Sequence, residues 1–199
     1  MRKIIHFVAI LIFTTGLFSF SISAQNSREQ RDQPEKLLDI AGVKSGMTVG
    51  EAGAGDGFLT FFLSKRVGAT GHVYANDIDS ASLQRLSERS RTEGQSNITT
   101  VLGKVDDPLF PVKGLDLVIM INAFHDFTER VAWLKNVKKY LKEDAGIFIF
   151  DKQTKHFSKG IAESEAEQAG FRVARSEHVQ DKIWLYELRV NPLRGNPGT

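Results

Sequence analysis

The run VGEAGAGDGF at 49–58 constrains the fold of this chain more than any other stretch. In it, glycines at alternate positions follow an acidic residue: Glu51, Gly53, Gly55 and Gly57. A strand is predicted before the glycines at 47–51, and apolar residues at helical spacing predict a helix at 57–66. Glycine at such a turn permits positive φ and close approach of a ligand, and the helix that follows offers unpaired N–H groups. The run therefore predicts a strand–turn–helix unit that either binds a polar ligand or is only a tight turn.

The spacing of this run excludes two common nucleotide-binding loops. The GxGxxG pattern needs a glycine or alanine five positions after its first glycine. That position holds Phe58 when counting starts at Gly53, and Thr60 when it starts at Gly55. A Walker A loop needs Gly-Lys-Ser/Thr at its end, which is also missing. The run is therefore neither a dinucleotide fingerprint nor a P-loop.

A second acidic position follows at the distance expected for a ribose-binding carboxylate. Asp77 ends the predicted strand at 71–76 and precedes a predicted helix at 80–93. In βαβ nucleotide sites an acid at the end of the second strand accepts hydrogen bonds from ribose hydroxyls. Either Asp77 or Asp79 is also a suitable helix cap. We assign ribose binding to Asp77, which directly follows the strand, and capping to Asp79.

Strand-like and helix-like segments alternate along the chain, which predicts a doubly wound α/β domain at 34–190. Several predicted strands are continuous apolar runs, as in buried parallel sheets. The last two strands are joined too closely for a helical crossover and are expected to form an antiparallel hairpin. Strands are predicted at 47–51, 71–76, 98–102, 115–121, 145–150, 171–178 and 183–190. Helices are predicted at 34–41, 57–66, 80–93, 129–141 and 158–169.

These motifs together resemble the class I S-adenosylmethionine-dependent methyltransferases, from about Asp32 to Val190. EAGAGDG is similar to their first motif, and VYANDID to their second strand with its ribose-binding acid. LDLVIMINAFHDF resembles their fourth strand and the loop after it, and EQAGF the turn before their sixth strand. The resemblance implies a mostly parallel seven-stranded sheet of order 3-2-1-4-5-7-6 with helices on both faces.

The resemblance also implies a binding site for S-adenosylmethionine. In it, Glu51 would face the methionine amino group, Asp77 would hold the ribose, and Ile78 would pack on the adenine. Further residues are expected around the cofactor: Ala52, Gly53, Ala54, Gly55, Gly57 and Asn122, the last of them near the reacting methyl group.

At one position this chain departs from the family pattern. The family often has an aspartate after the third strand that accepts a hydrogen bond from the adenine amino group. Lys104 stands there instead. Backbone groups of Val105 are expected to contact the adenine, and we hypothesise that Asp106 replaces the missing carboxylate.

The residues for chemistry are fewer, because methyl transfer depends chiefly on holding a nucleophile in line with the methyl group. His125, in the loop after the fourth strand, has a side chain suited to removing a proton near neutral pH. The alternative is that it only orders this loop. The remaining histidines show no ligand spacing with carboxylates, so no metal site is predicted.

The amino-terminal residues 1–24 read as a secretory signal peptide, with a basic start, an apolar stretch and small residues before Gln25. Cleavage would leave no stable membrane span and a periplasmic or secreted protein; an uncleaved membrane anchor is the alternative. A polar linker or arm is predicted at 25–33 and a flexible tail at 191–199. Because S-adenosylmethionine is made in the cytoplasm, export also raises a second function, a non-catalytic ligand-binding protein that retains the fold.

The charge balance argues against a nucleic-acid partner. The chain has 26 basic and 24 acidic residues, and removal of 1–24 takes away Arg2 and Lys3, leaving 24 of each. No basic stripe with interleaved aromatics is present. Absence of cysteine excludes thiol nucleophiles and cysteine metal sites. We therefore expect transfer of a methyl group to a small-molecule or protein acceptor, whose identity, like the oligomeric state, the sequence does not specify.

Overall fold

The computed structural model describes residues 28–191. The predicted signal peptide at 1–24, the first residues of the predicted arm and residues 192–199 of the predicted tail lie outside this range. The chain divides into two units, Met1–Leu37 and Leu38–Thr199. In the first unit residues 28–32 are helical, so the described part of the predicted polar arm is mainly helix, and α2 (Pro34–Ala41) begins directly after it.

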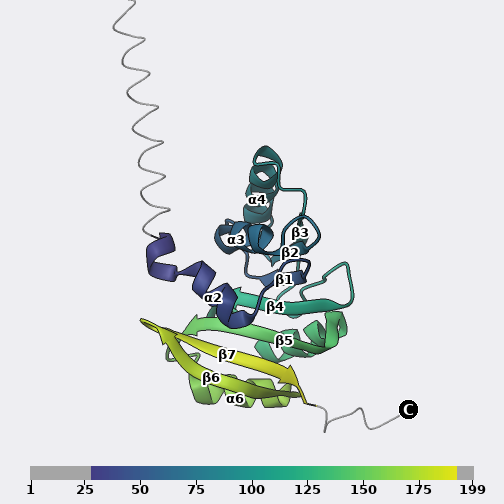
Figure 1. The fold of residues 1–199 in the computed structure, drawn as a ribbon. Coiled ribbons are helices and arrows are strands. Elements are labelled where there is room, and N and C mark those ends of the chain that lie inside the picture. The colour runs from purple at the N-terminus through teal and green to yellow at the C-terminus, as the bar shows by residue number, and fades with distance from the viewer. Residues whose placement is uncertain (1–27, 192–199) are drawn as a thin grey trace, which may run out of the picture. The chain divides into compact units, whose positions relative to one another are not determined.

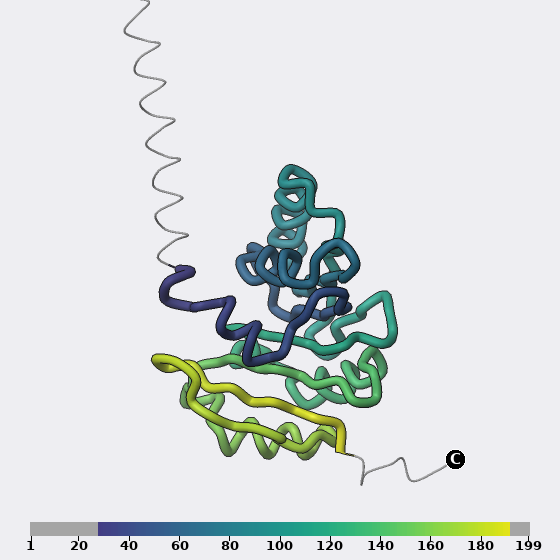
Figure 2. The backbone as a smooth tube through the Cα atoms, in the orientation of Figure 1, coloured from purple at the N-terminus to yellow at the C-terminus, as the bar shows by residue number. Residues whose placement is uncertain are grey.

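The second unit contains a seven-stranded sheet of order β3-β2-β1-β4-β5-β7-β6, which confirms the predicted topology (Figure 1). Strands β1 to β5 pair in parallel, and β7 pairs antiparallel with both β5 and β6. The closing hairpin can be followed along the tube of Figure 2. The strands are β1 (Thr48–Ala52), β2 (His72–Asp77), β3 (Ile98–Leu102), β4 (Leu115–Ile121), β5 (Leu141–Lys152), β6 (Phe171–Gln180) and β7 (Ile183–Val190).

Helices cover both faces of this sheet. The connections that carry α3 (Phe58–Val67) and α4 (Ser80–Thr92) run from β1 toward β3, and those that carry α5 (Arg130–Val137) and α6 (Lys159–Gln168) run the opposite way. Because crossovers between parallel strands are right-handed, opposite directions place the two sets of helices on opposite faces. In accordance with this, α3 and α4 contact β2, whereas α6 contacts α5 and β6.

Two neighbouring predicted elements, a helix and the strand after it, have wrong bounds. The helix expected at 129–141 is α5, which ends at Val137 and continues as a short 3-10 turn over Lys138–Tyr140. Strand β5, expected from 145, begins already at Leu141 because that residue pairs with Leu115 of β4. Pairing within the sheet therefore overrides the helical pattern of this stretch.

The central strands carry the core. In β4 the residues Leu117 to Met120 are all buried, and the main apolar cluster continues from β4 through β5 to α5 and α6.

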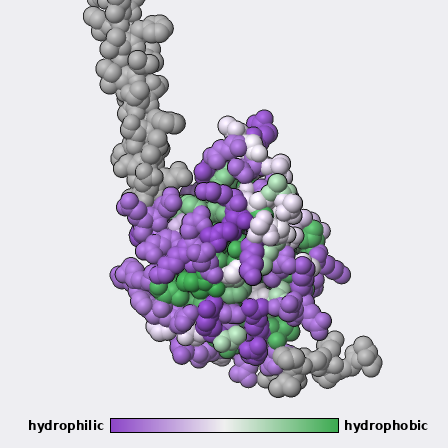
Figure 3. All heavy atoms as spheres, viewed as in Figure 1, coloured by the Kyte–Doolittle hydropathy of each residue, from purple (hydrophilic) through white to green (hydrophobic). Residues whose placement is uncertain are grey.

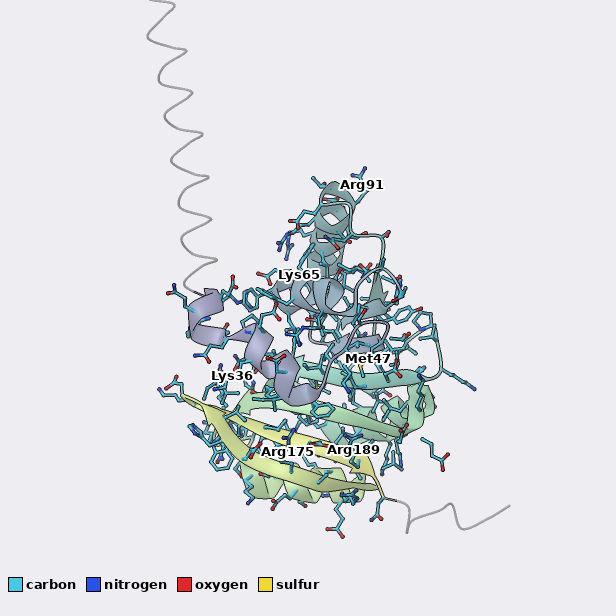
Figure 4. All side chains as sticks on the ribbon, viewed as in Figure 1. Lys36, Met47, Lys65, Arg91, Arg175 and Arg189 are labelled. Carbon is cyan, nitrogen blue, oxygen red and sulfur yellow. The ribbon has the colours of Figure 1, made fainter. Side chains whose placement is uncertain are left out.

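The exposed residues of the described range are mainly polar, and hydrophilic residues dominate the face seen in Figure 3. On the closing hairpin, Arg175 of β6 and Arg189 of β7, both labelled in Figure 4, form ion pairs with Glu187 at 3.0 and 2.8 Å. Among the described residues, no helix has the length and apolar character needed to cross a membrane.

Candidate functional site

The carboxyl ends of β1, β2, β3 and β4 meet at one edge of the sheet. The chain leaves β1 toward β2 on one side, while β4 pairs with β1 on the other side. Ligands of open α/β sheets bind at such a reversal point. A cavity of about 330 Å³, within the size range of small-molecule sites, is lined by residues that follow these strand ends. They are Gly53, Asn76, Asp77, Ile78, Lys104, Val105, Asn122, Ala123, Asp126, Phe127, Thr128 and Trp133.

The glycine loop between β1 and α3 is fixed by hydrogen bonds to the end of β2. The N–H groups of Gly53 and Ala54 donate to the carbonyl of Asn76 at 2.9 and 3.0 Å, and Gly55 donates to Asp77 Oδ2 at 2.8 Å. Gly55 has a φ of 53°, and a Cβ built on it would meet no atom within 4 Å. The backbone is thus open to a ligand at Gly55, in a conformation that side chains rarely adopt.

Glu51 lies beneath this loop, on the central strand β1. Its side chain is 2 % exposed, and its Oε2 accepts a hydrogen bond of 2.6 Å from the hydroxyl of Thr60 on α3. Burial raises the pKa of the Glu51 carboxyl to about 8; the Thr60 bond opposes this rise, and the carboxylates of Asp77 and Asp56 add to it. Glu51 is therefore mostly protonated at neutral pH, and a cation nearby would favour its ionised form.

Asp77, the last residue of β2, and Asp79, two residues further on, have different surroundings. Asp77 lines the cavity, and its Oδ1 accepts a hydrogen bond of 3.0 Å from the N–H of Asp79. Asp79 caps α4, accepting 3.0 Å from the N–H of Ala81 and 2.6 Å from the hydroxyl of Ser82, as predicted. The Ser82 bond, followed by the Ala81 bond, lowers the pKa of Asp79. Of these two aspartates, only Asp77 lines the cavity.

Another wall of the cavity comes from the ends of β2 and β3. Ile78 and Val105 are 60 % and 49 % exposed, which is unusual for aliphatic side chains of this size. Lys104 lines the cavity beside them. Asp106, the hypothesised replacement for a family aspartate, is not among the lining residues, and its carbonyl accepts a hydrogen bond from Asn136 at 2.9 Å.

The loop after β4 forms the aromatic wall. Asn122 lines the cavity with a φ of 50°, a conformation that asparagine tolerates better than most residues. Phe124 points into the core, with its ring 6.4 Å from Trp133 and 5.6 Å from Phe157. Phe127, whose ring lies 5.4 Å from Trp133, closes the cavity on this side.

His125, predicted for proton transfer, does not line the cavity. Its side chain is 10 % exposed, and Nδ1 lies 2.8 Å from Oδ1 of Asp151, within ion-pair distance but without hydrogen-bond alignment. Asp151 is fully buried at the end of β5, and its Oδ2 accepts a hydrogen bond of 2.9 Å from the N–H of His125. Burial, opposed by the His125 N–H, raises the pKa of Asp151. Asp126, 3.3 Å from His125 Nε2 and 78 % exposed, lines the cavity instead.

The predicted cofactor residues fall into two groups. Gly53, Asp77, Ile78, Val105 and Asn122 line the cavity. The others are not among the lining residues: Glu51, Ala52 and Ala54 are buried, Gly57 precedes the first turn of α3, and Gly55 and Asp106 lie in the loops beside the cavity.

Further lining residues were not singled out from the sequence. They are Asn76, Ala123, Asp126, Phe127, Thr128 and Trp133. For Asn76 the available signal was a polar residue at the end of a buried strand. No group of three or more metal-ligating side chains occurs within residues 28–191.

A family model described as a methyltransferase domain matches residues 43–189. Among curated proteins, the chain is similar to a ubiquinone/menaquinone biosynthesis C-methyltransferase of Citrobacter koseri. The two are 29 % identical over 127 residues, which cover 63 % of this chain and 49 % of that protein. The chain thus spans about half the length of the curated relatives it matches.

Solved structures give the same picture. A SAM-dependent methyltransferase from Aquifex aeolicus superposes with a TM-score of 0.76 at 29 % identity, covering 82 % of this chain and 93 % of that one. A TehB-like SAM-dependent methyltransferase from Corynebacterium glutamicum has a TM-score of 0.65 at 17 % identity, covering 88 % and 99 %. The second likeness concerns the fold alone.

Proposed function

The chain belongs to the methyltransferase domain family, and we propose that it transfers a methyl group from S-adenosylmethionine to a small aromatic acceptor. The observation that carries this proposal is the cavity at the carboxyl edge of the sheet. Part of its lining consists of residues expected to hold the cofactor, and another part is aromatic. Both partners of a methyl transfer could thus meet at this cavity.

The residues around the glycine loop fit the cofactor. Gly55 leaves room for backbone approach, Asp77 offers a carboxylate to the ribose hydroxyls, and Glu51 offers a negative charge when ionised. When bound, S-adenosylmethionine supplies a methyl group activated by a sulfonium centre. The chain's own contribution is to hold the acceptor in line with it, an effect that needs few dedicated side chains.

The acceptor class follows from the wall formed by the loop after β4. Phe127 presents a ring surface suited to a planar molecule, with the buried ring of Trp133 behind it, and Asp126 and Thr128 add polar atoms beside them. The curated relatives named for ubiquinone and menaquinone biosynthesis support a hydroxylated aromatic ring as acceptor. We therefore favour a phenol or quinol over a protein substrate.

Proton removal from such an acceptor would involve Asp126, which faces the cavity, with His125 as a positioning residue. The chain of contacts runs from Asp126 to His125 at 3.3 Å and from His125 to buried Asp151 at 2.8 Å. A carboxylate next to a histidine that is itself held in place is a common arrangement for acid–base work. The prediction of His125 as the base itself remains to be tested.

The proposed function is tested in two steps. Calorimetry with S-adenosylmethionine and S-adenosylhomocysteine first measures cofactor binding. Purified protein is then incubated with S-adenosylmethionine and a panel of phenols, quinols, amines and thiols, and S-adenosylhomocysteine release is followed. Release with a phenol or quinol supports the proposal. Binding without transfer to any acceptor would favour the non-catalytic ligand-binding protein, and no binding at all would refute the cofactor assignment.

We also propose that the domain is exported, on the basis of the amino-terminal sequence at 1–24 alone. The mass of the native protein tests this. A chain beginning at Gln25 in the periplasm or medium supports export. Met1 on a membrane-bound species would indicate an anchor, and Met1 on a soluble cytoplasmic species would refute export.

A further inference from the structure

The cavity wall that follows β3 has the opposite charge from the one that the family resemblance implies. Lys104 stands where an aspartate often accepts a hydrogen bond from the adenine amino group. Among the residues that line the cavity, Lys104 supplies the positive charge, and the carboxylates on the lining belong to Asp77 and Asp126. An ammonium group has three donors and no acceptor, so it cannot take the role of that aspartate.

Neither of the two nearby aspartates replaces the missing carboxylate. Asp106 is absent from the cavity lining. Asp107 is buried and its carboxylate already has three donors: the ammonium of Lys139, the hydroxyl of Tyr140 at 2.9 Å and the N–H of Leu109 at 3.0 Å. The Asp107 carboxylate is therefore used to hold the loop together and is not available to a ligand.

The loop that carries Lys104 is tied to the end of β2. The side-chain amide of buried Asn76 donates to the carbonyls of Val101 at 3.0 Å and Pro108 at 2.9 Å, and so joins both ends of the loop. The N–H of Gly103 donates to the carbonyl of Asp77 at 2.9 Å, and a Cβ on Gly103 would lie only 2.4 Å from Asn76 Nδ2. The backbone before Lys104 is thus held directly beside the predicted ribose carboxylate.

A second set of contacts fixes Lys104 itself. Its N–H donates to the carbonyl of Asp107 at 2.8 Å, and the side-chain amide of Asn136 on α5 holds the carbonyl of Asp106 at 2.9 Å. Lys104 is followed by Val105, the exposed aliphatic residue that also lines the cavity. A rigid backbone that presents one apolar side chain and one ammonium group is suited to packing against a flat heterocycle and donating a hydrogen bond to its edge.

We propose that Lys104 recognises the purine by donating a hydrogen bond to N1 of the adenine, in place of a carboxylate that accepts from the 6-amino group. This inference rests on the proposed function. N1 is the acceptor next to the 6-amino group on the same edge of the ring. A donor side chain at position 104 can therefore reach N1, just as a carboxylate there would reach the 6-amino group. In hypoxanthine the 6-oxo group is an acceptor on this edge, and Lys104 can donate to it. The site therefore tolerates a purine that a carboxylate would reject.

The test compares S-adenosylhomocysteine with S-inosylhomocysteine by calorimetry. The parent is expected to bind both within about threefold of each other. Lys104→Met should weaken both by about tenfold, the loss of one charge-assisted hydrogen bond at a partly exposed site. Lys104→Asp should prefer the adenosyl compound by about tenfold or more. Lys113→Met, which removes an exposed lysine of the same loop outside the cavity lining, is the matched control and should change neither affinity.

A second measurement does not depend on the aspartate variant. An S-adenosylhomocysteine analogue with carbon in place of N1 should bind about tenfold more weakly to the parent, with no further loss in Lys104→Met. Equal affinity of parent and Lys104→Met for S-adenosylhomocysteine would overturn the role of Lys104 and leave the proposed function intact. Failure of the parent to bind S-adenosylhomocysteine would overturn the proposed function, and this inference with it.

Discussion

We expect Glu51 to make cofactor binding depend on pH, because burial raises the pKa of its carboxyl. Burial raises the pKa of its carboxyl to about 8 in the free protein, against the hydrogen bond from Thr60. If the ammonium group of S-adenosylmethionine binds near it, as proposed, the ionised form is favoured in the complex. Binding below about pH 8 must then release a proton, and we expect the affinity to fall as the pH is lowered.

The magnitude follows from the same pKa. For a group protonated in the free protein and ionised in the complex, affinity falls by up to tenfold for each pH unit below about 8. Between pH 8 and pH 6 the limit is about a hundredfold, or roughly 2.7 kcal/mol. Glu51→Gln keeps an acceptor for Thr60 and removes the titration. This variant should therefore bind S-adenosylhomocysteine, which retains the ammonium group, with an affinity that hardly changes over this range.

The free protein should show a corresponding effect on stability. A carboxyl whose folded pKa is raised from 4.5 to about 8 contributes stability that is fully present below its unfolded pKa and lost as the pH rises through its folded pKa. The free energy of unfolding is thus expected to fall between about pH 4.5 and pH 8, by at most roughly 4 to 5 kcal/mol. Glu51→Gln should flatten this part of the stability curve.

The assay is calorimetry with S-adenosylhomocysteine from about pH 6 to pH 9, in two buffers whose ionisation enthalpies differ, so that released protons are counted directly. Glu88→Gln, which changes an exposed glutamate on α4, is the matched control and should behave like the parent. Proton release that is lost only in Glu51→Gln supports the reasoning. A parent affinity that does not vary with pH, or an unchanged slope in Glu51→Gln, would refute it.

The remaining predictions concern the loops around the cavity. Gly55→Val should abolish measurable S-adenosylhomocysteine binding, because a branched residue strains a φ of 53° and fills the open side of the loop; parent-like calorimetry on the folded variant would contradict this. Asp77→Ala should weaken S-adenosylhomocysteine binding by roughly ten- to a hundredfold. Asp79→Ala should instead lower the melting temperature and leave this affinity unchanged. A larger loss of affinity in Asp79→Ala than in Asp77→Ala would move the ribose role to Asp79. With an acceptor from the screen, Asp126→Asn should reduce kcat about a hundredfold at unchanged cofactor affinity. His125→Gln should reduce kcat less, and a larger effect at His125 would make it the base.

The fold was predictable because its signals are local. The buried strand 115–121 is one continuous apolar run, and the glycines between β1 and α3 lie where the chain must turn. The bounds of α5 and β5 were not predictable in the same way. The stretch 129–141 has helical spacing, and only the pairing of Leu141 with Leu115 makes its end extended. That pairing is set by the sheet and not by the residues nearby.

The site was predictable where strand ends determine it. Gly53, Asp77 and Asn122 come directly after β1, at the end of β2 and after β4, and parallel strands bring these ends together. The direction of side chains in the loop after β4 was not predictable. There the 3-10 turn at Phe124–Asp126 turns His125 toward Asp151, a partner that follows it by 26 residues. Sequence spacing locates such a loop but does not decide which of its side chains faces a ligand.

The residues of the aromatic wall differ in how cleanly substitutions can test them. Trp133 is 1 % exposed and belongs to the main core cluster, so replacing it with alanine would destabilise the fold by about 3 to 5 kcal/mol and affect any activity indirectly. Asp126 and Thr128 are exposed on the same wall and contribute little to the core. Acceptor preference is therefore best examined through these two residues, because a change in kcat or KM there reports on the acceptor and not on loss of folded protein.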